Sequence, residues 1–121
     1  MAFDSNCSIV AELARWVRAN EVAVREAGIE MIFRQPWADS PWKSGVGFIH
    51  NDIVVDYTVW ERTIFQTSLV VLNGLSKKTL VSDDNEPSES SVVRRDLDTI
   101  VRKLVDGTFA NMKPDQKFKG R

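Results

Sequence analysis

The spacing of apolar residues changes at Gly28, and this change limits the possible folds more than any other feature of the chain. Before Gly28, apolar residues recur at intervals of three and four, which predicts one face of a helix over about residues 8–27. That stripe comprises Ile9, Val10, Leu13, Trp16, Val17, Asn20 and Val24. Asp4, Ser5 or Ser8 can cap the helix start, and a glycine suits the left-handed position that commonly closes a helix. After Gly28 the apolar residues alternate, so the chain must combine helix and sheet.

The segment after the helix predicts a strand and then a loop that contains two tryptophans. Its alternation places Ile29, Met31 and Phe33 on one face and Glu30, Ile32 and Arg34 on the other. Pro36 ends the strand, because proline fixes its own backbone and restricts the residue before it. In residues 36–45, PWADSPWKSG, Trp37 and Trp42 each follow a proline. Two indoles in a loop must either pack onto the core or wait at the surface for a partner to bury them.

Two or three further strands follow in residues 45–74, and their register can be tested by matching apolar residues across each turn. A two-residue turn at His50-Asn51 places Phe48 opposite Ile53. At the next turn, a three-residue loop over residues 61–63 matches apolar partners, whereas a two-residue loop does not. This register predicts a core side with Ile53, Val55, Tyr57, Val59, Phe65, Leu69 and Val71. The opposite, mixed side then holds Val54, Asp56, Thr58, Trp60, Ile64, Gln66, Ser68 and Val70.

A short strand at about residues 79–82 and a final helix over about 91–112 complete the predicted elements. Ser90 or Ser91 can cap that helix, and Asp98 and Arg102 are spaced to pair on its polar side. Its apolar stripe comprises Val93, Leu97, Ile100, Val101, Leu104 and Thr108. The predicted fold is an α+β two-layer sandwich in the order α-β-β-β-β-α. It has an antiparallel meander of four to five strands, with the N- and C-terminal helices on one face.

Composition and charge favour one cytoplasmic domain over residues 1–112, followed by a flexible basic tail over 113–121. The 121 residues are 43% hydrophobic and contain one cysteine, Cys7, which permits no intrachain disulfide. The N-terminus lacks the features of a secretory signal, and no apolar stretch approaches the length of a membrane span. The acidic residues 82–91, SDDNEPSESS, predict a solvated loop. The tail predicts a chain end and not a nucleic-acid site.

The sequence contains no recognisable catalytic or metal-binding pattern. The one histidine, His50, is expected at a hairpin tip, and no His or Cys cluster has metal-ligand spacing. No phosphate loop or nucleophile elbow is present in the sequence. Asp56 and Glu61 fall on different predicted faces, which argues against a carboxylate pair. We therefore expect a binding protein that needs no cofactor, and not an enzyme.

The order of elements, together with the ARW segment at residues 14–16 and DYTVWE at residues 56–61, resembles the TriTu type of immunity protein in bacterial polymorphic toxin systems. The resemblance covers about residues 13–109, and the proline–tryptophan loop and the basic tail depart from the family pattern. It implies a bacterial protein that binds and neutralises a cognate toxin domain, as in contact-dependent growth inhibition. The partner would be that toxin domain, with no role for nucleic acid or membrane, and the free protein would be a monomer.

If the protein blocks a partner, aromatic anchors ringed by polar groups should supply the affinity. The expected partner-binding residues are Trp37, Asp39, Trp42, Lys43, Asp56, Thr58, Trp60, Arg62, Asp83 and Asp84. One of the loop tryptophans could instead fold over the end of the sheet as a structural plug. Two alternatives remain open: a dimeric secretion-chaperone-like protein that also binds through an open sheet, and a domain that binds a small molecule in an apolar pocket.

Overall fold

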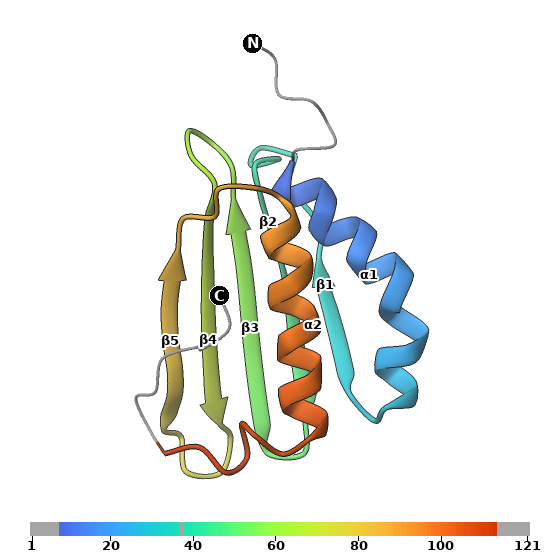
Figure 1. Cartoon of the computed structure of the whole chain (residues 1–121), viewed down its shortest axis with the longest axis vertical. Helices are drawn as coiled ribbons and strands as arrows, with labels where there is room; N and C mark the ends of the chain where they lie inside the picture. The colour runs from blue at the N-terminus through green and yellow to red at the C-terminus, as the bar shows by residue number, and fades with distance from the viewer. Residues whose placement is uncertain (1–7, 37, 114–121) are drawn as a thin grey trace.

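The computed structural model describes residues 8–36 and 38–113, which form two helices packed on one face of a five-stranded sheet (Figure 1). The elements are α1 (Ile9–Glu26), β1 (Glu30–Arg34), β2 (Lys43–His50), β3 (Ile53–Trp60), β4 (Gln66–Asn73), β5 (Thr79–Asn85) and α2 (Ser91–Val105). Neighbouring strands are antiparallel and follow chain order, so the sheet is a meander with β1 and β5 at its edges. The predicted α+β architecture is confirmed. The expectations for Asp4, Ser5, Cys7, Trp37 and residues 114–121 lie outside the described residues.

Helix α1 begins and ends close to the predicted residues. The Ser8 hydroxyl accepts the backbone N–H of Ala11 at 3.1 Å, which is the hydrogen bond that an N-cap makes. Gly28 follows the helix with a φ of 83°, a backbone conformation that costs glycine little. Trp16 is only 4% exposed and meets the Phe48 ring edge-on, with 6.0 Å between the ring centroids. The prediction that Trp16 is a packing residue is confirmed.

The sheet keeps the predicted faces but not the predicted register. In the β2–β3 hairpin Phe48 lies opposite Val55, because the two turn residues are Asn51 and Asp52, one position later than expected. Asn51 has a φ of 54°, and asparagine tolerates this left-handed conformation better than most residues. The β2–β3 pairing is therefore displaced by two residues from the predicted one, and a displacement of two leaves every side chain on its predicted side of the sheet.

The β3–β4 connection is also longer than predicted. It spans residues 61–65, so Val59 lies opposite Thr67, and Phe65 is outside both strands while it still packs partly against the core. The connection begins at Glu61, whose side chain extends to the start of α1. The error is again two residues, so the predicted core face of β3 and β4 is confirmed.

The sequence predicts one solvated loop over the acidic residues 82–91, and the structure shows that this prediction is wrong for part of the segment. Residues 82–85 are the second half of β5, which pairs with β4 from Thr67 to Leu72 with an irregularity at Val71 and Leu72. An edge strand needs apolar residues on one side at most, and charged residues there oppose pairing with another sheet edge. The alternation is lost in the run Ser-Asp-Asp-Asn, which is why the sequence predicts a strand shorter than the seven residues of β5.

Helix α2 ends at Val105, earlier than the predicted Met112. Gly107 has a φ of 81°, and the Asp106 carboxylate accepts hydrogen bonds from the Thr108 hydroxyl and backbone N–H, which lower its pKa. Thr108 is therefore exposed, and Phe109 is fully buried instead. Ser90 occupies the N-cap position without a capping side-chain hydrogen bond.

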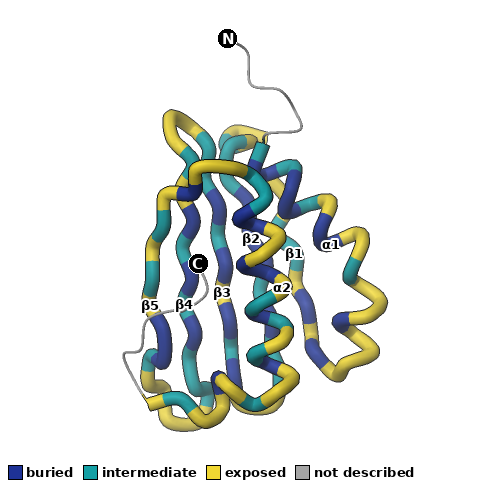
Figure 2. Tube along the Cα trace, in the orientation of Figure 1, coloured by how far each residue is buried: buried dark blue, intermediate teal, exposed yellow. Residues whose placement is uncertain are grey.

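The core lies between the helices and the sheet, where both layers carry buried residues (Figure 2). Polar side chains connect the two layers. The Tyr57 hydroxyl of β3 donates to the fully buried Asp96 carboxylate of α2 at 2.6 Å. The indole N–H of Trp16 donates to Asp98 at 2.8 Å, in place of the predicted pairing of Asp98 with Arg102. These bonds fix α1 and α2 relative to each other and to the sheet.

Candidate functional site

Both described helices lie on one face of the sheet, and the opposite face is called the open face from here on (Figure 1). Strand alternation determines which side chains lie on this face, and along the strands they form two halves of different character. The half near the β2–β3 turn is mostly apolar, with Ile32, Ile49, Val54, Val70 and Leu72, and it includes the charged Glu30, opposite Ile49. Ile32 is 49% exposed, and the other four apolar residues are half-buried by one another. The half near the β3–β4 connection is mixed, with Arg34, Lys43, Asp56, Thr58, Trp60, Gln66, Ser68 and Asp84.

Two tryptophans predicted to bind a partner lie where β2 begins and β3 ends. Lys43 pairs with Trp60 across the two strands, and its ammonium group lies 5.6 Å from the centroid of the Trp60 ring. Arg62, in the β3–β4 connection, lies 5.2 Å from the centroid of the Trp42 ring. Both indoles are half-buried. The structure therefore brings four of the predicted residues together as two cation–aromatic pairs.

Asp56 and Thr58 join this region through Arg34, a residue that the sequence analysis does not select. The Arg34 guanidinium crosses β2 from β1, and its Nη2 donates to the Asp56 carboxylate and to the Thr58 hydroxyl, the latter at 3.2 Å. It can cross because β2 has glycine at position 45, where any side chain would collide with it. The signal in the sequence is the Gly-x-Gly pattern within a predicted strand, since glycine in a strand often marks a close approach.

The remaining predicted residues are more scattered. Asp84 lies on the open face opposite Ser68, but Asp83 lies opposite Leu69 and so points to the helix side at the sheet edge. Asp39 is exposed in the turn between β1 and β2. Trp37 lies outside the described residues.

Glu61 has a structural role that sequence reasoning does not reveal. Its carboxylate accepts the backbone N–H of Ile9 at 2.9 Å and the Ser8 hydroxyl at 2.7 Å. The first turn of a helix has backbone N–H groups without partners in the helix, and a carboxylate there also interacts favourably with the helix dipole. Glu61 thus attaches the end of β3 to the start of α1. It lies 52 residues from Ile9 along the chain, so no local pattern could predict the contact.

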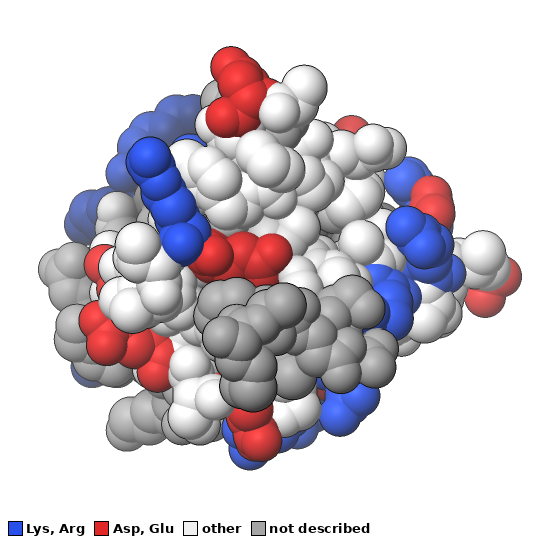
Figure 3. Space-filling model, turned by 90° about the horizontal axis from the view of Figure 1, so that it is seen from above, with Lys and Arg blue, Asp and Glu red and all other residues white. Residues whose placement is uncertain are grey.

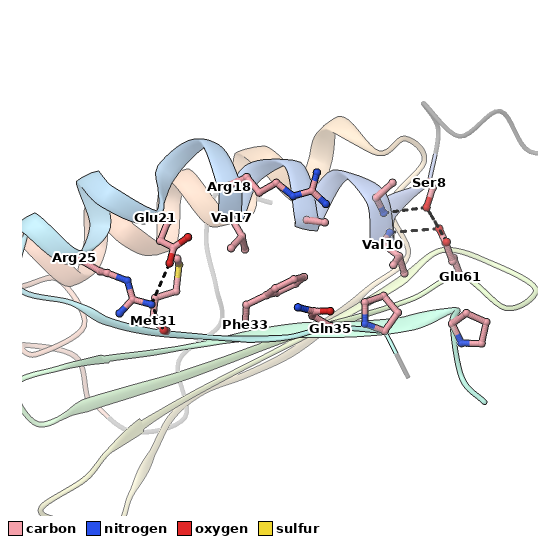
Figure 4. A pocket seen from close by; sticks show the side chains of 14 residues that line it. Ser8, Val10, Val17, Arg18, Glu21, Arg25, Met31, Phe33, Gln35 and Glu61 are labelled. Carbon is pink, nitrogen blue, oxygen red and sulfur yellow. Dashed lines mark hydrogen bonds and ion pairs between the residues drawn. The ribbon is translucent and has the colours of Figure 1, made fainter. Parts of the chain in front are cut away.

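A hollow lies elsewhere, between α1 and the edge strand β1 (Figure 4). It has a volume of about 720 Å³ and a mixed lining, in which Val10, Val17, Met31 and Phe33 are joined by polar residues such as Arg18. On its rim, Arg25 pairs with Glu21 at 3.4 Å and also donates to the backbone oxygen of Met31 at 3.2 Å. The second bond occupies an outward-facing carbonyl group of the edge strand, which restricts strand addition at that position.

Charged side chains of both signs surround the end of the molecule at which β3 finishes (Figure 3). Uncharged residues fill much of the visible area between them. In the described ranges, no three His, Cys, Asp or Glu side chains converge as they would around a metal ion. Neither described helix combines the length and apolar character needed to cross a membrane. No protein-family model matches the chain, and neither does any curated protein or solved structure.

Proposed function

We propose that this protein binds another protein through its open sheet face, and that it acts as an immunity protein of the TriTu type. The observation that carries the proposal is the open face itself, which combines partly exposed apolar residues near the β2–β3 turn with Trp60 and Lys43 at its other end. Protein interfaces commonly combine an apolar centre with aromatic anchors and a polar rim. The resemblance of residues 13–109 to immunity proteins supplies the identity of the partner, a toxin domain.

Inhibition would follow from occupying a surface of the toxin and would require no chemistry on it. Tryptophan suits such an anchor because it buries a large area with little loss of conformational freedom. The two layers beneath it make the surface stiff, since Tyr57 and Asp96 connect β3 to α2 directly behind the open face. A stiff surface binds with a smaller entropic cost.

The test uses the product of the gene next to the one encoding this chain. The two proteins are co-expressed, and growth is measured together with the affinity of the purified pair by titration calorimetry. Trp60→Ala should weaken the complex by about 2 kcal/mol or more while the variant unfolds cooperatively, because the anchor is lost without a core cavity. Leu75→Ala is the matched control, since Leu75 is an apolar residue that is 76% exposed at the opposite end of the sheet. Equal losses in both variants, or none in either, would rule out the open face as the interface.

A small-molecule-binding domain is the second candidate, and the hollow between α1 and β1 is the observation that favours it. Its volume of about 720 Å³ falls in the range typical of ligand pockets, and its lining combines apolar with polar side chains. Val17→Trp would fill this hollow without altering the open face. Retention of protein binding and protection by Val17→Trp would separate the two candidates in favour of the first.

A further inference from the structure

The outer side of the edge strand β1 has backbone groups that no other described strand uses. The two-residue turn that follows His50 makes His50 and Ile53 a hydrogen-bonded pair, and such pairs alternate along an antiparallel ladder. Even-numbered residues of β2 therefore bond to β3, and its odd-numbered residues bond to even-numbered residues of β1. The backbone groups of Met31 and Phe33 must then point outward, away from β2. The bond from Arg25 to the Met31 oxygen agrees with this direction.

Most of these outward groups are available to a further strand. Within the part of the chain that the structure describes, Arg25 occupies the Met31 oxygen, and no group bonds the Met31 N–H or either backbone group of Phe33. The Arg25 side chain is 53% exposed, so another donor can replace its bond at little cost. The opposite edge differs, because Asp83 and Asp84 in β5 oppose pairing with another strand. Strand addition is therefore favoured at β1.

The hollow between α1 and β1 gives an added strand room for its side chains. The second half of α1 lies beyond β1, on the side away from β2, so a strand placed beside β1 would lie under this helix (Figure 1). Residues that face each other in an antiparallel pair share one side of the sheet. Side chains opposite Met31 and Phe33 would therefore enter the hollow, into which Val17 points from α1 (Figure 4).

The charges on the rim of the hollow favour an acidic residue in the added strand. Arg25 pairs with Glu21 at 3.4 Å, and the Glu61 carboxylate is bonded to the start of α1. Arg18 also lines the hollow, and its exposed side chain makes no ion pair or hydrogen bond with any described residue. Figure 4 shows Arg18 above Gln35, at the end of β1. A carboxylate opposite Gln35 would give this guanidinium a partner.

We propose that β1 receives an antiparallel strand from another protein, with apolar side chains opposite Met31 and Phe33 and an acidic side chain that pairs with Arg18. The backbone of the added strand would supply affinity, and the hollow would select its alternate side chains. An N–H of the added strand would replace Arg25 at the Met31 oxygen. This surface is separate from the open face, so the inference goes beyond the proposed function and does not depend on it.

The direct test titrates the full-length ¹⁵N-labelled protein with the capped peptide acetyl-Thr-Glu-Thr-Val-Thr-Val-Thr-amide, whose glutamate and valines lie on one side of a strand. The backbone amide signals of Met31 and Phe33 should shift in a saturable way. N-methylation of the first valine removes an N–H that points to β1, so it should weaken binding by about tenfold or more. N-methylation of the second threonine removes an N–H that points away and should leave the affinity nearly unchanged. Equal affinities of the two methylated peptides would refute strand addition and assign the hollow to apolar groups alone.

A mutant cycle tests the charged contact. Replacement of the peptide's glutamate by glutamine should weaken binding to the wild-type protein by about threefold, as expected for an exposed ion pair. The same replacement should make no difference to the variant Arg18→Gln, because the partner of the carboxylate is already absent. Additive losses would show that Arg18 does not recognise the acidic residue.

Two variants of α1 locate the peptide. Val17→Trp fills the hollow and should abolish the peptide's shifts, whereas Val22→Trp makes the same change at a residue that is 69% exposed and should leave them unchanged. Equal responses of the two variants would refute the proposal. Signals of Met31 and Phe33 that shift with protein concentration alone would assign the edge to a second copy of this chain instead. The toxin takes no part in these measurements, so their failure would leave the proposed function standing.

Discussion

Asp56 and Tyr57 are neighbours in β3, yet each takes part in a polar contact of a different kind. Tyr57 is fully buried under α2 and donates to Asp96, whose carboxylate is also fully buried. Asp56 lies on the open face, pairs with Arg34, and has a side chain that is 53% exposed. The strand thus separates a contact that supports the fold from a contact that water and salt can reach. The difference teaches that a polar contact behind the sheet contributes to stability, while an exposed one on the open face contributes little.

The largest effect is expected from a cavity on the helix-covered side. Leu97→Ala should lower the free energy of unfolding by about 2–5 kcal/mol, because Leu97 is fully buried between α2 and the sheet and its neighbours cannot collapse completely. Urea unfolding followed by circular dichroism measures the change. Ile32→Ala is the control on the open face and should cost far less, since Ile32 is already half-exposed. Similar losses in both variants would remove the distinction between the two faces.

A smaller effect is expected from the buried hydrogen bond. Tyr57→Phe keeps the ring and removes the donor to Asp96, so it should destabilise the protein by about 1–3 kcal/mol through the lost bond at a buried carboxylate. The double variant Tyr57→Phe with Asp96→Asn completes a mutant cycle and isolates the interaction between the two side chains. Additive losses would mean that the two groups do not interact in solution.

The two faces could be predicted from the sequence because a strand repeats every two residues. An error of two residues at each hairpin leaves every side chain on its correct side, as Val55 and Val59 show. The register itself could not be predicted, because it depends on Asn51 adopting a positive φ and on Glu61 leaving the hairpin. The first is a local backbone conformation and the second is a contact between distant parts of the chain. Neither can be inferred from the pattern of apolar residues.

The sequence could place a candidate site residue only where strand alternation alone decides which face of the sheet it occupies. Thr58 and Trp60 are on the open face, as the alternation indicates, and Lys43 joins them through its pairing with Trp60. The alternation does not single out Arg34, because its contact with Asp56, two strands away, depends on a glycine in the strand between them and not on its own neighbours in sequence. Phe109 was missed for a related reason: the chain turns at Gly107, so the helical period no longer predicts which side is buried.

The smallest effect on stability is expected from the exposed ion pair on the open face. Asp56→Asn should change the free energy of unfolding by about 1 kcal/mol at most, because solvent already screens a pair whose side chains are 41% and 53% exposed. The amide oxygen can still accept a hydrogen bond from Arg34, so the difference that remains is electrostatic. It should therefore shrink further when urea unfolding is repeated in concentrated sodium chloride, where the screening length falls to about 3 Å at 1 M. A loss as large as that of Tyr57→Phe, or one that persists in high salt, would show that the open face contributes to the fold as the covered face does.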